Sequence, residues 1–196
     1  EDYRMIRIKE KDGNREMKMI ELHENGLDIQ FRIRENGVVE LADFSSQEVK
    51  KAVMELKEDI CYPAVEIHRS GTGSLNMHAY KNNINQSSVD FVYENHELKA
   101  QDGGKELEIV MVSPEKLKAV YHMRLFDGVP AVQTWTEIVN EGSEDQGLTY
   151  VSSFMYQGIA RGGEKPYYKK TDIYVPFNSW CCEAQWQKYD AETLNL

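Results

Sequence analysis

Residues 25–37 read Asn-Gly-Leu-Asp-Ile-Gln-Phe-Arg-Ile-Arg-Glu-Asn-Gly, an alternating segment enclosed by two Asn-Gly pairs. Leu27, Ile29, Phe31 and Ile33 fall on one side of an extended chain and polar side chains on the other, because successive strand residues point to opposite faces. Asn-Gly pairs supply the positive φ angles that two-residue hairpins need. The stretch therefore predicts a half-buried strand between two tight turns, in an antiparallel sheet with one solvated face.

The same two signals recur along the chain. Residues 107–111 and 119–126 alternate between apolar and polar side chains in the same way. Asx-Gly pairs that predict hairpin turns occur at Asp12-Gly13, Asn25-Gly26, Asn36-Gly37, Asp102-Gly103 and Asp127-Gly128. Further strands are expected near residues 3–9, 17–23, 38–44, 62–68, 88–95, 131–140, 147–156, 171–176 and 180–188.

About a dozen strands exceed what one twisted sheet carries, so two sheets packed face to face are expected. A helical pattern covers residues 46–57, where Ser45 and Glu48 match a capping box and apolar residues follow at helical spacing. No repeat or linker divides the chain. The predicted fold class is all-β: an antiparallel two-sheet β-sandwich with at most one or two short helices, formed as a single domain over residues 1–196.

Charge and cysteine usage exclude several classes of function. The formal net charge of −10 repels phosphate backbones and anionic lipids, so neither nucleic acid nor a membrane is an expected partner. Apolar runs are far shorter than the roughly 20 residues of a membrane span. Cys61, Cys181 and Cys182 form no disulfide framework, because two are adjacent and no C-x-x-C occurs. Reduced thiols suit a cytoplasmic protein.

Searches for catalytic and metal-binding motifs give no assignment. The five histidines show no H-x-x-x-H spacing, so neither a metal site nor a cofactor is expected. Gly71-x-Gly73 lacks the third glycine of a dinucleotide-binding loop. Ser113-x-x-Lys116 matches the spacing of a nucleophilic-serine motif, but Pro114 places it in a turn. The acidic residues lie on the polar faces of predicted strands and in loops, and no two of them stand out as the carboxylate pair that a glycosidase needs. No catalytic residue is predicted.

Aromatic side chains carry the remaining compositional signal. Trp135, Trp180 and Trp186 offer flat faces on which sugar rings stack. Large aromatics also fill the cores of β-sandwiches, and packing is the favoured interpretation for any one of the three.

Several segments resemble one enzyme family. Residues 175–186 read VPFNSWCCEAQW and resemble the Asn-Ser-Trp…Glu-x-Gln-Trp segment in bacterial α-galactosidases of glycoside hydrolase family 36. Other segments similar to the same domain are residues 65–71 (VEIHRSG) followed by His78 and Lys81, residues 121–126, and residues 135–142. The likeness runs in order over most of residues 27–196. It departs from the family at Ala79 and Tyr80, where small residues are common, and at Cys181-Cys182, which replace polar or small residues.

The resemblance implies an N-terminal β-supersandwich that precedes a (β/α)8 barrel and a small C-terminal β domain. In this family two barrel aspartates hydrolyse terminal α-galactosides with retention. A barrel needs about 250 residues of its own, so the catalytic carboxylates are expected downstream of Leu196 and the present chain is expected to be inactive. The expected partners are that barrel, further copies of the enzyme in a homo-oligomer, and α-galactoside sugars.

The resemblance also supplies candidate site residues. Asn178, Ser179, Trp180, Glu183 and Trp186 are expected to form an interface or to line a sugar pocket, with strand packing inside the sandwich as the alternative. His78 and Lys81 form a second set, with an ordinary solvated loop as the alternative.

Two other functions remain open from the sequence. A stand-alone carbohydrate-binding module requires an exposed aromatic platform, and we expect Trp180 and Trp186 not to form one. A sugar mutarotase, with a related supersandwich, needs convergent acids and bases, for which Glu66, His68 and His78 are the clustered candidates. We further expect the domain to expose an apolar patch where a barrel docks.

Overall fold

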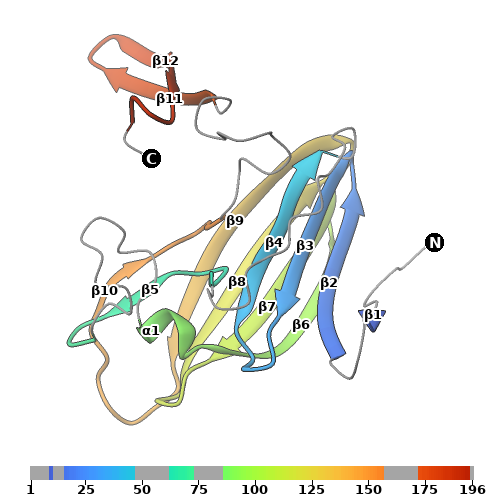
Figure 1. The fold of residues 1–196 in the computed structure, drawn as a ribbon, viewed down its shortest axis with the longest axis vertical. Helices are drawn as coiled ribbons and strands as arrows, with labels where there is room; N and C mark the ends of the chain where they lie inside the picture. The colour runs from blue at the N-terminus through green and yellow to red at the C-terminus, as the bar shows by residue number, and fades with distance from the viewer. Residues whose placement is uncertain (1–8, 11–15, 47–61, 73–85, 157–171, 195–196) are drawn as a thin grey trace. The chain divides into compact units, whose positions relative to one another are not determined.

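A computed structural model describes residues 9–10, 16–46, 62–72, 86–156 and 172–194 of the chain. These residues form an all-β structure with a single short helix among them (Figure 1). The elements are β1 (Lys9–Glu10), β2 (Glu16–Glu24), β3 (Leu27–Ile33), β4 (Val39–Ser46), β5 (Ile67–Arg69), α1 (Gln86–Val89), β6 (Val92–Gln101), β7 (Gly104–Val112), β8 (Leu117–Phe126), β9 (Val129–Asn140), β10 (Leu148–Val151), β11 (Asp172–Ser179) and β12 (Cys182–Asp190).

The described chain falls into two compact units. The first contains β1 to β10, and the second contains the β11–β12 hairpin with the residues that follow it. Each unit is described by itself below. The single domain over residues 1–196 stays a prediction.

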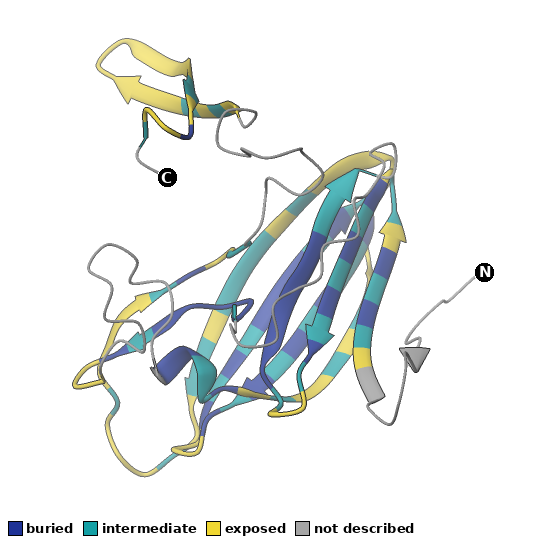
Figure 2. Ribbon diagram, viewed as in Figure 1, coloured by how far each residue is buried: buried dark blue, intermediate teal, exposed yellow. Residues whose placement is uncertain are grey.

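The first unit is a β-sandwich of two four-stranded antiparallel sheets, with strand orders β1-β2-β3-β4 and β6-β7-β8-β9. Side chains of β3 and β7–β8 meet between the sheets in one apolar core. Phe31 of β3 packs edge-on against Tyr121 of β8 with ring centroids 5.7 Å apart. Burial alternates along β3 as the sequence predicts, with every second residue buried (Figure 2). The predicted two-sheet sandwich is confirmed.

Hairpin turns tie the two sheets together at both ends of the sandwich. Asn25 and Gly26 connect β2 to β3 with φ angles of 51° and 83°, the left-handed values that favour this dipeptide. The Asn25 side chain donates from Nδ2 to Phe126 O (2.8 Å) and accepts at Oδ1 from Gly128 N (2.9 Å), in the β8–β9 turn. At the other end Gly37 O accepts a hydrogen bond from Tyr93 N at 2.7 Å. The turns therefore fix the alignment of the sheets as well as the register of each hairpin.

Four predicted strands differ from the structure. The strand expected near 62–68 is confined to β5, because the chain before it makes only an isolated bridge between Pro63 and Glu40. The one near 88–95 begins as helix α1, and the one near 147–156 ends at Val151. The strand expected from residue 180 begins at Cys182, because Trp180 and Cys181 form the hairpin turn.

Some predictions fall on residues outside the described ranges. The strand near 3–9 is described only at Lys9, and the Asp12-Gly13 turn not at all. Of the helix expected over residues 46–57, the structure describes Ser46, which belongs to β4. Among the described helical residues there is no segment of the length and hydropathy that a membrane crossing demands.

Candidate functional site

The β11–β12 hairpin brings together the first set of candidate residues. Its register pairs Pro176 with Trp186 and Ser179 with Cys182, with an irregularity between them. Cys181 occupies the turn with a φ of 59°, a left-handed backbone conformation that is unusual for residues other than glycine and asparagine. Asn178 Oδ1 accepts a hydrogen bond from Ala184 N at 2.7 Å and so closes the irregular end of the hairpin. A hollow of about 430 Å³ there is lined by Asn178, Ser179, Glu183 and Ala184.

The aromatic side chains of this hairpin are exposed. Trp180 at the turn is 93% exposed and Trp186 is 64% exposed. The strand register places Tyr174, Pro176 and Trp186 on one face, while Phe177 and Tyr189 contact each other on the opposite face at 6.3 Å. Packing of Trp180 and Trp186 inside the sandwich, the alternative interpretation, stays a prediction, because the hairpin and the sandwich are each described by themselves. The expectation that Trp180 and Trp186 do not form an exposed aromatic platform for sugars likewise stays a prediction.

The second candidate set lies outside the described residues. His78 and Lys81 belong to residues 73–85, so the structure does not test them. Their neighbours in the sequence are described: His68 Nε2 lies 2.7 Å from Glu66 Oε1, and the ring of Tyr150 lies 5.1 Å from the imidazole. This acid–imidazole pair has the groups for proton transfer, but the mutarotase set of Glu66, His68 and His78 stays a prediction.

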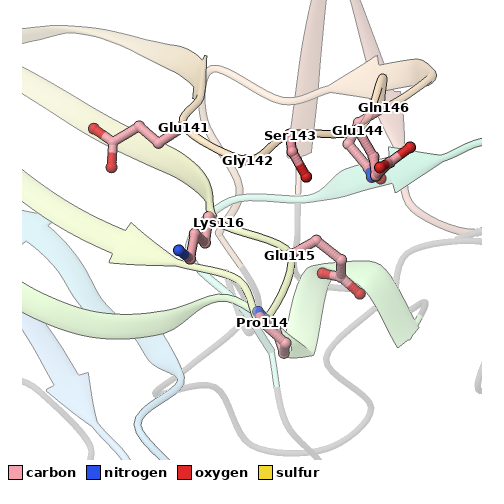
Figure 3. Close-up of a pocket in the computed structure, with 8 residues that line it drawn as sticks. All are labelled: Pro114, Glu115, Lys116, Glu141, Gly142, Ser143, Glu144 and Gln146. Carbon is pink, nitrogen blue, oxygen red and sulfur yellow. The ribbon is translucent and has the colours of Figure 1, made fainter.

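A hollow of about 480 Å³ lies where the β7–β8 turn meets the segment that follows β9 (Figure 3). Glu115 lies at its edge and contacts Arg69 Nη1 at 2.6 Å. Burial pushes the pKa of Glu115 upward, but hydrogen bonds from the backbone, Arg69 and Ser113 outweigh it and leave this pKa below its ordinary value. Ser113 and Lys116 form the turn itself, with Lys116 N donating to Ser113 O, as Pro114 predicts. The remaining lining residues are Pro114, Lys116, Glu141, Gly142, Ser143, Glu144 and Gln146.

A further cluster lies on the outer face of the second sheet, the face turned away from the apolar core. His122 of β8 lies between Glu106 and Glu108 of β7 and Glu137 of β9. The indole of Trp135 stacks on the imidazole with centroids 4.6 Å apart and planes 5° from parallel. Trp135 thus packs against His122 on the outer face, whereas the sequence favoured packing in the core. Motif searches missed this cluster because its members come from three strands.

We also compared the chain with known proteins. No protein-family model matches it, and a search of curated proteins gives no significant match.

Proposed function

We propose that this chain is the N-terminal β-sandwich of an α-galactosidase similar to glycoside hydrolase family 36, serving to dock the catalytic barrel and to form oligomer contacts. Residues 175–186, 65–71, 121–126 and 135–142 carry the sequence resemblance. The two-sheet antiparallel architecture of the first unit is compatible with that assignment. In the proposed enzyme the hydrolytic aspartates belong to the downstream barrel, and this chain contributes surface rather than chemistry.

The observation that carries the proposal is the exposure of the β11–β12 hairpin. The segment that most resembles the family contains Trp180 and Trp186, which are both largely in water. Indole rings are enriched where protein surfaces meet, because they bury a large apolar area at little cost in side-chain entropy. An exposed pair on one hairpin therefore favours contact with a second surface, which we assign to the barrel or to another subunit.

The proposal is tested first by activity. Purified chain should give no turnover of a nitrophenyl α-galactoside above that of buffer, because no barrel is present. Clean protein that hydrolyses this substrate would contradict the assignment of the chemistry to a downstream domain.

A second experiment tests the docking role in the enzyme encoded by this chain together with its downstream sequence. Trp180→Ala should lower the thermal midpoint of that enzyme or shift its oligomeric state in light scattering. Tyr150→Ala is the matched control, because Tyr150 is an exposed aromatic of the first unit. Equal effects of the two substitutions would refute a special role for the hairpin.

A stand-alone carbohydrate-binding module is the second candidate. It is favoured by the face that Tyr174, Pro176 and Trp186 share, because flat exposed aromatic rings are the groups on which sugar rings stack. Isothermal titration of the chain with galactose and melibiose separates the two proposals. Tight binding that Trp186→Ala abolishes would establish the module, whereas absence of heat favours the docking role.

A further inference from the structure

The outer face of the second sheet brings two carboxylates and an imidazole to one point. Glu106 and Glu108 are two residues apart on β7, so both side chains project from the same face. The strand register places His122 of β8 directly opposite Glu108. His122 Nδ1 lies 2.9 Å from Glu106 Oε1 and 3.9 Å from Glu108 Oε1. One oxygen of each carboxylate and the imidazole nitrogen all lie within 4.8 Å of one another.

This group is withdrawn from water although it lies on an outer face. His122 is only 8% exposed, because the Trp135 indole covers one side of its ring. The side chains of Glu106 and Glu108 are 13% and 22% exposed. Partial desolvation strengthens the repulsion between the two carboxylates, and Lys99, which contacts Glu108, offsets part of it.

The hydrogen bonds of the cluster leave one buried atom without a partner. His122 Nε2 is inaccessible to water and makes no hydrogen bond, and the nearest acid to it is Glu137 Oε2 at 3.8 Å. Lys99 Nζ contacts the outer oxygen of Glu108, Oε2, at 2.5 Å, which leaves Oε1 directed at the imidazole. Nδ1 therefore faces two carboxylate oxygens, and Nε2 faces a third acid that it does not reach.

We propose that Glu106, Glu108 and His122 form a binding site for a divalent metal ion of the zinc type, with one oxygen from each carboxylate and Nδ1 of the imidazole as ligands. Zinc binds imidazole and carboxylate at about 2.0–2.2 Å, which separates neighbouring ligand atoms by about 3.3 Å in a tetrahedral site. The observed separations of 2.9 and 3.9 Å from Nδ1 lie on either side of that value. Small side-chain rotations bring the three atoms to it, and water completes the coordination.

The mixed donor set also decides the class of metal. Carboxylates and water alone suit Mg²⁺ and Ca²⁺, whereas a buried imidazole nitrogen selects borderline ions such as Zn²⁺. Metal-bound histidines usually donate their other ring N–H to a carboxylate. Metal binding at Nδ1 fixes the proton on Nε2, and Glu137 Oε2, now 3.8 Å away, would accept it after a small side-chain rotation.

Such a site links β7 to β8 and stabilises the sheet by binding the folded state. It is independent of the proposed enzyme, since it requires only these two strands and their neighbours.

The test is zinc titration of the full chain after treatment with a chelator. The parent protein carries Cys181→Ser and Cys182→Ser, because these exposed thiols would bind zinc themselves. We expect one equivalent of Zn²⁺ to bind and to raise the thermal midpoint. Glu108→Gln or His122→Gln should weaken binding at least about 10-fold, and Glu137→Gln by about 10-fold with unchanged stoichiometry.

Glu141→Gln is the matched control, because Glu141 is an exposed glutamate that pairs with Lys118 near the start of β8, away from the imidazole. Its zinc affinity should stay within about 2-fold of the parent, as for independent sites. Zinc affinity that is equal in the parent and in Glu108→Gln would overturn the proposal.

A spectroscopic readout does not depend on how the variants fold. The ¹⁵N resonance of His122 Nδ1 in the parent protein should shift on addition of Zn²⁺, while His68, which pairs with one carboxylate, should not respond. A saturating zinc concentration that leaves the His122 Nδ1 resonance unchanged would show that His122 forms only an ion pair with Glu106.

Discussion

Strand β3 and strand β11 both carry apolar side chains at every second position, yet they differ in burial. Along β3 every apolar residue is buried, and Ile29 and Phe31 have no exposed surface. Along β11 the alternating residues are half-buried at most, and Phe177 is 45% exposed. The difference lies within each unit: β3 faces β7 and β8 across a core, whereas the described part of the second unit contains a single two-stranded sheet. Period-two alternation thus predicts a strand, and an opposing sheet decides whether that strand is buried.

The turns of the two regions differ as well. Most described hairpin turns of the sandwich place glycine at positive φ, for example Gly26 and Gly128, and the β7–β8 turn places Lys116 there. The β11–β12 turn places Cys181 there and contains no glycine. A β-carbon in this conformation costs about 1–2 kcal/mol. The hairpin therefore retains local strain in the same region that exposes its aromatic residues.

The largest expected effect is on the free energy of unfolding when an aromatic side chain of each region is replaced by alanine. Phe31→Ala should lower the free energy of unfolding by about 3–5 kcal/mol, because it leaves a cavity beside Tyr121 in the core. Trp186→Ala removes a larger side chain but should change that free energy by less than about 0.5 kcal/mol, since the indole is mostly in water. Urea unfolding monitored by circular dichroism measures both. Comparable losses would show that the hairpin packs in a core after all.

A smaller effect is expected from relief of the strained turn. Cys181→Gly should stabilise the hairpin by about 0.5–1 kcal/mol, because the steric penalty removed exceeds the entropy that glycine loses on folding. Amide hydrogen exchange of β11 and β12 measures this locally. Cys181→Ser keeps the β-carbon and should leave the exchange rates unchanged. If both substitutions slow the exchange, the stabilisation comes from removal of the thiol and not from relief of backbone strain.

The smallest expected effect is a difference in pH response. Burial lowers the pKa of His96 in the sandwich below its ordinary value of 6.5, and its Nδ1 lies 2.7 Å from Tyr93 Oη. The unfolded chain then binds the proton more readily, so stability is complete above pH 6.5 and falls as the pH drops below that value toward the folded pKa. In the hairpin, hydrogen bonds from Thr193 lower the pKa of Asp190 below 3.8, so its contribution is lost only in more acidic solution.

Urea midpoints of the sandwich between pH 8 and pH 5, compared with those of His96→Gln, measure this contribution. His96→Gln should remove the part of the decrease in the urea midpoint at low pH that His96 causes. An unchanged pH profile in His96→Gln would assign the decline to other groups.

Much of the sandwich could be predicted from local signals. Asn25-Gly26 and Asp127-Gly128 set their turns because few other dipeptides tolerate positive φ, and alternation over residues 27–33 required one buried face. The strand predicted at 62–68 failed because buried residues such as Val65 reach the core from irregular chain, where alternation carries no information. Exposure of Trp180 could not be predicted, because aromatic residues fill cores and surfaces alike.

The sequence by itself determined the all-β class, the antiparallel pairing of successive strands and the alternation of their faces, because these depend on backbone sterics and on neighbours two residues away. Only the tertiary structure decided which strands have a sheet opposite them. It also decided that His122 meets Glu106 and Glu108. Such juxtapositions depend on strand register and on packing between residues far apart in the chain, which no local pattern specifies.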